Sequence, residues 1–246
     1  MTLEACRATA SPAAVGHSLV DVFSKSYVPC CASRSLICRL IADGATLSLR
    51  AAARTAAHDL VEIHHPICVL FTLYVIALYG PTICIYILSF RDVRGTIEVE
   101  VAGSPLPDAP PGARGFVGVV FRVQAADESF GSEGIYLRPT NGRADDQVRR
   151  NHSTQYFAYP GYDFARLRRE APAQYESYVD LIPGEWTTMR IEVQGTTAKL
   201  FVGGAPQPTL IVNDLKRGAD AHGSVGLYVD NGTDGHFRNL RVRLTS

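Results

Sequence analysis

Cysteine is missing from most of this chain, because all six thiols lie in the first 84 residues and none follows Cys84. A chain of 246 residues is long enough to bury a sizeable hydrophobic core, so its stability does not require disulfide cross-links. No CxxC pair occurs, and the spacing from Cys30, Cys31 and Cys38 to the later histidines matches no standard zinc pattern. We therefore expect ordinary buried thiols, no metal and no cofactor.

An excess of charge is also missing, since 24 Lys and Arg residues balance 24 Asp and Glu residues. Without a net field, the chain has no global attraction for nucleic acid, and we expect no nucleic-acid partner. The nucleophile elbow GxSxG, the HExxH zinc motif and the phosphate loop are absent as well. Any active or binding site must therefore be assembled from residues that carry no standard local motif.

One long apolar run, from Pro66 to Phe90, contains no charged residue and is long enough to cross a bilayer as a helix. Gly80-Pro81 interrupts it, and its content of Ile, Val, Thr and Tyr favours a hairpin of buried strands instead. The run lies too far from Met1 for a secretory signal peptide, so a cytoplasmic or membrane-associated location is expected. Sandwich strands and a membrane span both remain open for residues 66–90.

The residues before that run show no sustained period, apart from an Ala- and Arg-rich stretch in 45–63. We divide the chain into an N-terminal segment at 1–65, the apolar segment at 66–90 and a β-rich domain at 91–246. The loss of cysteine near this last boundary also fits a fusion or a reading-frame error upstream of a good domain. Detecting peptides from the first segment in the natural protein by mass spectrometry would exclude that alternative.

Alternation of polar and apolar residues becomes clear after residue 91. In GTIEVEV (95–101) every second residue is apolar, as in a strand with one face in water. The same period recurs in TMRIEV (188–193), AKLFV (198–202), SVGLYVD (224–230) and NLRVRL (239–244). GFVGVVFRV (115–123) is apolar at nearly every position, which predicts a central strand covered on both faces.

Turn-forming sequences separate these runs, among them SPLPDAPPGARG, PTNG, PGEW and DNGTDG. Many short strands with few helical stretches predict an all-β fold, an antiparallel jelly-roll sandwich. No repeat of fixed period is visible, which speaks against a propeller.

The succession of these motifs resembles a bacterial concanavalin A-like jelly-roll domain over about residues 90–246. The most transferable piece is the closing pattern, in which GEW (184–186) opens a strand and GSVGLYVDNGTDGHFRNLRV (223–242) follows. The chain is similar to laminin G-like domains and to the family described as 3-keto-disaccharide hydrolases. The resemblance implies a carbohydrate ligand or substrate, although this architecture hosts lectins, hydrolases and adhesion modules alike.

Catalytic carboxylates are hard to place in this sequence. A glycosidase needs two carboxyl groups on either side of the scissile bond, and the resemblance to glycoside hydrolases of this fold implies acidic residues at alternate positions of one strand. Glu98 and Glu100 share a strand face, but an ordinary solvated face predicts the same pattern. Catalysis therefore stays open.

The strongest candidate for a site is the segment IYLRPTNGRADDQVRRNHSTQY (135–156), a strand that runs into a cluster of charges. Arg, Asn and Asp side chains bind adjacent sugar hydroxyls through directional hydrogen bonds, and aromatic rings pack on the apolar face of a pyranose. The predicted ligand-binding residues are Tyr136, Arg138, Asn141, Arg143, Asp145, Arg149, Arg150, Asn151, Tyr156 and Tyr159.

The alternative for this segment is an internal network that clamps a long loop onto the sheet. We predict a lectin-like domain that binds carbohydrate or a similar hydroxyl-rich molecule. A glycoside hydrolase of the same fold is the first alternative, and an interaction or structural module anchored in a membrane through 66–90 is the second. A binding site should leave donors facing a hollow, whereas a purely structural network should satisfy them all.

Overall fold

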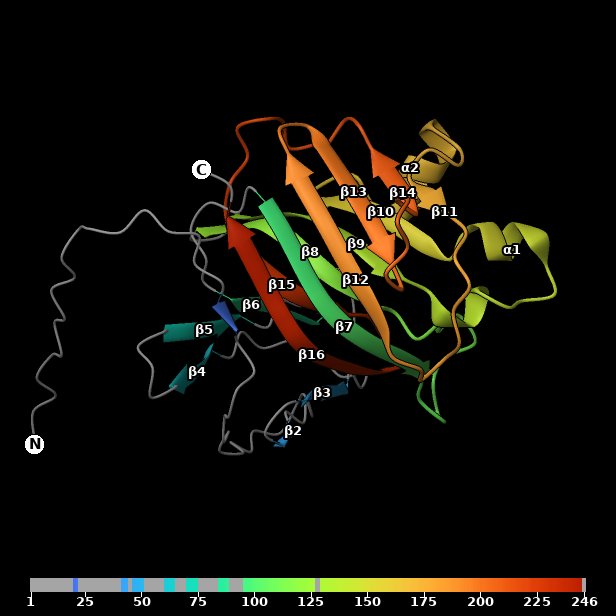
Figure 1. Cartoon of the computed structure of the whole chain (residues 1–246), viewed down its shortest axis with the longest axis horizontal. Helices are drawn as coiled ribbons and strands as arrows, with labels where there is room; N and C mark the ends of the chain where they lie inside the picture. Colours follow the sequence, from blue (N-terminus) through green and yellow to red (C-terminus); the bar gives the residue numbers. More distant parts are fainter. Residues whose placement is uncertain are drawn as a thin grey trace, which may run out of the picture.

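In this computed structural model the described residues are 95–126, 129–244 and six short strands before residue 89, with side chains described at 95–124 and 131–243. The described strands form an eight-stranded and a six-stranded sheet, and a separate two-stranded ribbon, and every pairing among them is antiparallel. Figure 1 shows the two larger sheets as stacked layers. The predicted all-β antiparallel jelly-roll sandwich is confirmed.

The eight-stranded sheet is built around the long strands with one polar face. Its members are β1 (Val20–Asp21), β2 (Ile41–Asp43), β3 (Thr46–Arg50), β7 (Gly95–Pro105), β12 (Thr187–Gln194), β13 (Thr197–Val202), β14 (Leu210–Val212) and β16 (Thr233–Leu244). The order is β14-β13-β12-β7-β16-β3-β2, with β1 paired to β16. The predicted alternation on β7 and β12 therefore falls on neighbouring strands of this sheet.

The six-stranded sheet has the order β11-β10-β9-β8-β15-β6. Its members are β6 (Cys84–Leu88), β8 (Val117–Ala126), β9 (Ser129–Leu137), β10 (Thr154–Tyr159), β11 (Glu176–Ser177) and β15 (Ser224–Val229). The apolar strand β8 lies inside the sheet, where both of its faces are covered, as its sequence predicts.

The main core lies between the two sheets. Alternate residues of β7 and β12, such as Ile97 and Ile191, meet alternate residues of β8 and β9, such as Val119 and Ile135. These four side chains are completely buried. Since the side-chain period of a strand is two, their neighbours point to the two outer faces of the sandwich.

The outer face of the six-stranded sheet carries a second, smaller cluster of buried residues, formed by Val120, Val123, Tyr136 and Tyr228. The rings of Tyr136 and Tyr228 are stacked, with centroids 5.1 Å apart. They meet across Gly118, which is paired with Tyr136 on one side and with Tyr228 on the other. Glycine in this strand therefore allows two rings to lie together over the backbone.

Three short helical elements lie at one end of the sandwich. They are the 3-10 helix η1 (Pro139–Asn141), α1 (Gln147–Asn151) and α2 (Phe164–Glu170). Asp146 caps α1 and Asp163 caps α2, each accepting a hydrogen bond from a backbone N–H three residues on. In Figure 1 both α-helices stand beside β10 and β11, away from the chain termini.

The described part of the apolar run is two strands. β5 (Leu70–Tyr74) pairs with β4 (Leu60–His64), and β6 pairs with β15 of the six-stranded sheet. The other residues of 66–90, and most of 1–65, lie outside the described residues, so the division of the chain into three segments stays a prediction. Among the helices that the structure describes, none has the length and hydropathy to span a bilayer.

Candidate functional site

The predicted segment begins on the outer face of the six-stranded sheet. Strand register places Gln155 opposite both Glu176 and Tyr136, so these three side chains form one row across β11, β10 and β9. Arg138 follows two residues after Tyr136 and turns over the same row, with its Nη2 donating to the Tyr136 hydroxyl (2.8 Å) and to Gln155 Oε1 (3.2 Å). The first half of the segment therefore joins this row instead of extending into solvent.

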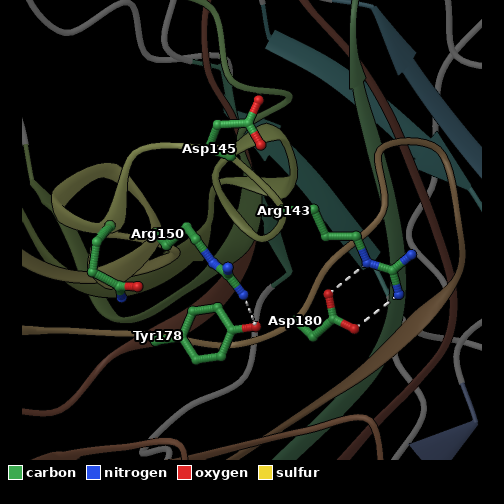
Figure 2. Close-up of a pocket in the computed structure, with 7 residues that line it drawn as sticks. Arg143, Asp145, Arg150, Tyr178 and Asp180 are labelled. Carbon is green, nitrogen blue, oxygen red and sulfur yellow. Dashed lines mark hydrogen bonds and ion pairs between the residues drawn. The ribbon is translucent and has the colours of Figure 1, made fainter.

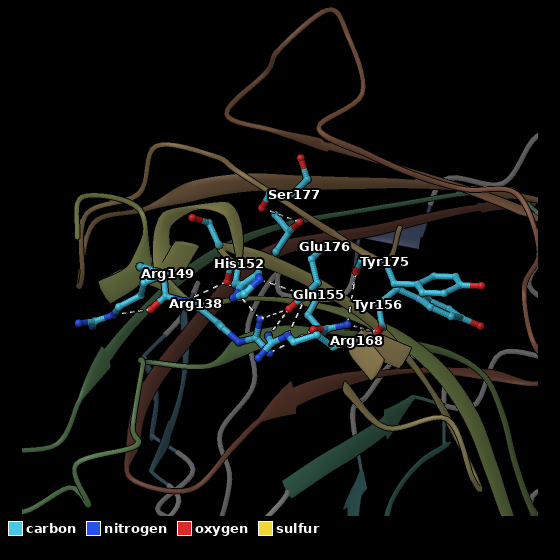
Figure 3. Close-up of polar contacts among 12 residues, drawn as sticks. Arg138, Arg149, His152, Gln155, Tyr156, Arg168, Tyr175, Glu176 and Ser177 are labelled. Carbon is cyan, nitrogen blue, oxygen red and sulfur yellow. Dashed lines mark hydrogen bonds and ion pairs between the residues drawn. The ribbon is translucent and has the colours of Figure 1, made fainter. Parts of the chain in front are cut away.

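Glu176 is the centre of this arrangement, which we call the Glu176 cluster: Arg138, His152, Gln155, Arg168 and Glu176 (Figure 3). Its carboxylate accepts from Arg138 Nη1 at 3.1 Å and from Arg168 Nε at 3.0 Å, and the side chain is only 2% exposed. His152 Nε2 lies 3.4 Å away. Arg168 comes from α2, so the cluster ties this helix to the sheet.

Electrostatics in the cluster follow from burial and from the surrounding cations. Burial opposes ionisation of Glu176, but the hydrogen bond from Arg168 and the nearby cationic groups outweigh it and lower the pKa of this carboxyl. Burial lowers the pKa of His152, and the neighbouring guanidinium groups add to this effect although Glu176 opposes it. The cluster thus holds an ionised glutamate and an imidazole that is neutral near pH 7.

Asn141 and Arg149 form the next part of the network. Asn141 Nδ2 donates to the carbonyl oxygen of His152 (3.0 Å), while its Oδ1 accepts from Arg149 Nε (3.0 Å). Arg149 Nη2 donates to Thr140 Oγ1 (3.1 Å). These contacts join η1 to α1, as the clamping alternative predicts.

Tyr156 lies on the opposite face of β10, in the core between the sheets. Its hydroxyl donates to Glu133 Oε1 (2.6 Å), and Glu133 in turn pairs with Arg122 (3.0 Å). Arg122, Glu133 and Tyr156 are all completely buried. The structure therefore places this predicted ligand-binding tyrosine in an internal network, away from the surface.

A hollow of about 440 Å³ adjoins the second half of the segment, between the loop before α1 and the chain after β11. We call it the loop hollow. Its lining residues are Arg143, Ala144, Asp145, Gln147, Arg150, Tyr178 and Asp180. Three of the predicted site residues, Arg143, Asp145 and Arg150, are thus brought together around one space (Figure 2).

The polar groups of the loop hollow retain hydrogen-bonding capacity. Arg143 donates from Nε (2.7 Å) and Nη2 (2.8 Å) to the two oxygens of Asp180, which leaves Nη1 for another acceptor. Arg150 Nη2 donates to the Tyr178 hydroxyl (2.9 Å), while its Nε is buried and has no partner in the described part of the chain. The hydrogen bond from Arg143, opposed by a smaller effect of burial, lowers the pKa of Asp180.

The remaining predicted residues, Asn151 and Tyr159, do not line the hollow. Asn151 is exposed at the end of α1, where its Oδ1 accepts from Gln147 Nε2 (2.7 Å). Tyr159 is half-buried at the end of β10, and its carbonyl oxygen accepts from Arg217. Tyr178 and Asp180 were not among the predicted site residues, although their spacing of two in an extended segment places both side chains on one side.

The carboxylates considered for catalysis lie on the other sheet. Glu100 accepts from Arg238 Nε (2.7 Å) and from Asn239 Nδ2 (2.6 Å), and Glu98 lies 3.6 Å from Arg241. Both are therefore ion-paired on the outer face of the eight-stranded sheet. Within 95–124 and 131–243, no three His, Cys, Asp or Glu side chains are grouped so as to hold a metal ion. Cys30, Cys31 and Cys38 lie outside the described residues.

Sequence comparison identifies a domain family. The profile of the 3-keto-alpha-glucoside-1,2-lyase-like domain matches residues 82–243. This match confirms the resemblance to the 3-keto-disaccharide hydrolase family. It starts at residue 82, between β5 and β6, and therefore before the expected domain boundary at residue 91. No curated protein matches the chain in sequence.

Solved structures with a similar fold are distant in sequence. A Bacillus subtilis protein with a galectin-like fold is 10% identical, with coverage of 84% of this chain and 86% of that one and a TM-score of 0.49. A Bacillus licheniformis beta-glucanase is 13% identical, with coverage of 94% and 99% and a TM-score of 0.47. The carbohydrate-binding module CBM66 from Bacillus subtilis is 12% identical, with coverage of 65% and 81% and a TM-score of 0.45.

Proposed function

This chain belongs to the 3-keto-alpha-glucoside-1,2-lyase-like domain family, and we propose that it binds carbohydrate in the loop hollow. The observation that carries the proposal is the combination of Arg143, Arg150 and Tyr178 around one open space of about 440 Å³. A hollow of this size suits one or two sugar rings, because ligand sites commonly measure about 300–1,000 Å³.

The chemistry of the lining supports a hydroxyl-rich ligand. Within the described residues, Nη1 of Arg143 and Nη1 of Arg150 have no acceptor, and the Asp145 carboxylate is exposed in the same lining. Adjacent hydroxyl groups both donate and accept, so a sugar can satisfy the guanidinium donors and the carboxylate at once. The Tyr178 ring, 41% exposed, offers a surface for the apolar face of a pyranose.

Binding is better supported than hydrolysis at this place. A glycosidase requires one carboxylic acid that holds its proton near neutral pH while its partner is ionised. Asp180 faces the hollow, but its pKa is lowered mainly by the hydrogen bond from Arg143. It is therefore ionised and a poor proton donor, which leaves only Asp145 as a carboxyl in the lining.

An elimination reaction is the second candidate, favoured by the description of the family as lyase-like. Breaking a glycosidic bond by elimination begins with removal of a proton next to a carbonyl group, which requires a base. His152 in the Glu176 cluster is neutral near pH 7 because burial lowers its pKa. Incubation with a 3-keto-α-glucoside, followed by detection of the released sugar, tests this candidate.

The binding proposal is tested on a glycan array and by calorimetry with the glycans that bind. We expect Arg143→Ala to weaken binding about tenfold or more, since a charged hydrogen bond contributes about 1.5–3 kcal/mol, and Tyr178→Ala to weaken it by removing the ring that packs on the sugar. Arg169→Ala is the matched control, because this exposed arginine lies on α2 outside the hollow. The proposal is wrong if the wild type binds no glycan, or if both hollow variants bind as it does.

A further inference from the structure

The arginines at this end of the sandwich fall into two groups according to their partners. Arg138 and Arg168 pair with Glu176, and Arg143 pairs with Asp180. Among the residues that the structure describes, no carboxylate forms an ion pair with Arg114, Arg149 or Arg150. Their hydrogen-bond acceptors are backbone carbonyls, an amide, a hydroxyl and a phenol, all of them neutral.

These guanidinium groups without an ion pair lie close to one another, although Asp180 is near enough to Arg150 for the two charges to attract. The backbone carbonyl of Arg114 accepts from Thr140 N (3.2 Å), and Thr140 Oγ1 accepts from Arg149. Arg150 is the next residue of α1. Burial lowers the pKa of Arg114, and the positive charges of Arg149 and Arg138 lower it further, which is the effect expected where cations outnumber nearby anions.

Arg150 alone in this second group lines the loop hollow. Its guanidinium stands over the Tyr178 ring at 5.0 Å from the centroid and donates from Nη2 to the Tyr178 hydroxyl. Its Nε is buried with no acceptor within the described residues. Because Nε is enclosed, a ligand reaches this guanidinium through its terminal nitrogens, and a carboxylate is a strong acceptor for such a charged donor.

We infer that the carbohydrate bound in the loop hollow is acidic, a hexuronate whose carboxylate is received by the guanidinium group of Arg150. The inference rests on the proposed function, because it names the class of sugar for the same hollow. Nη1 of Arg150 has no acceptor within the described residues and, unlike Nε, is not enclosed, so it would receive a carboxylate oxygen. The Tyr178 hydroxyl accepts from the same arginine (Figure 2), so its ring would lie beside the bound sugar.

Asp145 makes the inference sharper. This carboxylate also lines the hollow, is exposed and has no ion pair within the described residues, so it repels an anionic ligand. Its neutralisation therefore strengthens the binding of an acidic sugar through Coulomb's law. For a neutral sugar the same change only removes an acceptor for hydroxyl groups and weakens binding. Neutralising Asp145 should therefore raise the affinity for an acidic sugar and lower the affinity for a neutral one.

The experiment compares matched sugars that differ only at C6, namely methyl glucuronide with methyl glucoside and methyl galacturonide with methyl galactoside. Calorimetry on the full chain should give an affinity at least about tenfold higher for one uronide than for its neutral partner. Arg150→Gln should abolish this preference, and Asp145→Asn should increase it. Arg169→Gln and Asp108→Asn are the controls, since both residues are exposed and lie outside the hollow.

The possible outcomes distinguish the preference for an acidic sugar from carbohydrate binding as such. Equal affinity for acidic and neutral sugars, or a preference that survives Arg150→Gln, overturns the inference and leaves the proposed function standing. Binding of neither class in the hollow overturns both. If Arg150→Gln does not fold, as judged by its melting curve, weaker binding of the uronide to Asp145→Asn is by itself sufficient to refute the inference.

Discussion

At the scale of single residues, burial separates the groups that maintain the structure from those available to a ligand. Arg138 is 5% exposed and donates to a carbonyl, a carboxylate, a phenol and an amide. Arg143, five residues later, is exposed and keeps one nitrogen free. The clamping network and the candidate site thus follow each other in one segment, and neither alternative describes all of it.

Glu176→Gln tests the structural role of the Glu176 cluster through pH. Because the folded state lowers the pKa of Glu176, its ionised form stabilises the protein above the pKa of the unfolded chain. That contribution is lost as pH falls through the folded pKa. We expect Glu176→Gln to lower the free energy of unfolding by about 2 kcal/mol or more at pH 7.

The difference between the two proteins should shrink as pH falls below the pKa of an unfolded glutamate, because protonation of the unfolded chain then opposes the ionised Glu176 of the folded state. Urea unfolding at pH 7 and at pH 3.5 measures it. Glu170→Gln serves as the control, since Glu170 is exposed on α2 and its removal should change stability little at either pH. A constant difference across this range would mean that the charge of Glu176 does not stabilise the fold.

At the scale of elements, the strands are the part that the sequence determines best. The alternation in 95–101 and 188–193 corresponds to β7 and β12, with Ile97 and Ile191 inward and Glu98 and Arg190 outward. Such a period is local, so it can be read from neighbouring residues. The pairing of Arg138 with Glu176 is not local, because 38 residues separate them and strand register brings them together.

Short helices were harder to predict. The stretch 162–178 contains α2 (Phe164–Glu170), yet its charges of both signs are typical of a solvated segment and do not by themselves indicate a helix. Asp163 caps this helix and Leu167 anchors it in the core, whereas Arg166 and Glu170 form an exposed pair. With only one buried residue, the segment shows no repeating apolar pattern from which a helix could be recognised. Tertiary contacts determine whether so short a segment is helical.

Gly118→Ala tests the close approach of strands and rings in the six-stranded sheet. A Cβ at this position would lie 2.4 Å from the carbonyl oxygen of Ile135 and 2.6 Å from Cα of Tyr136. Because both contacts involve backbone, the strand itself must move, at a cost of about 1–3 kcal/mol. Thermal unfolding measures this cost. Gly112→Ala is the control, since a Cβ there meets nothing within 4 Å; equal stability of both variants would refute the account of this face.

At the scale of the whole molecule, two sheets form one sandwich whose loops at one end hold the candidate site. The fold class and the family resemblance followed from strand periods and the closing motif, and both are confirmed. Of the predicted site residues, Arg143, Asp145 and Arg150 line the hollow, while Tyr156 lies in the core. Residue type marks a group that can bind sugar, but only the fold determines whether it faces a ligand or another side chain.

The most direct measurement is a crystal structure of the protein soaked with methyl glucuronide, and with methyl glucoside in a parallel crystal. The account predicts electron density for a sugar ring between the 143–150 loop and residues 178–180, within hydrogen-bonding distance of Arg143 or Arg150. An empty hollow with a sugar on the outer face of the six-stranded sheet, beside Tyr136 and Tyr228, would contradict it.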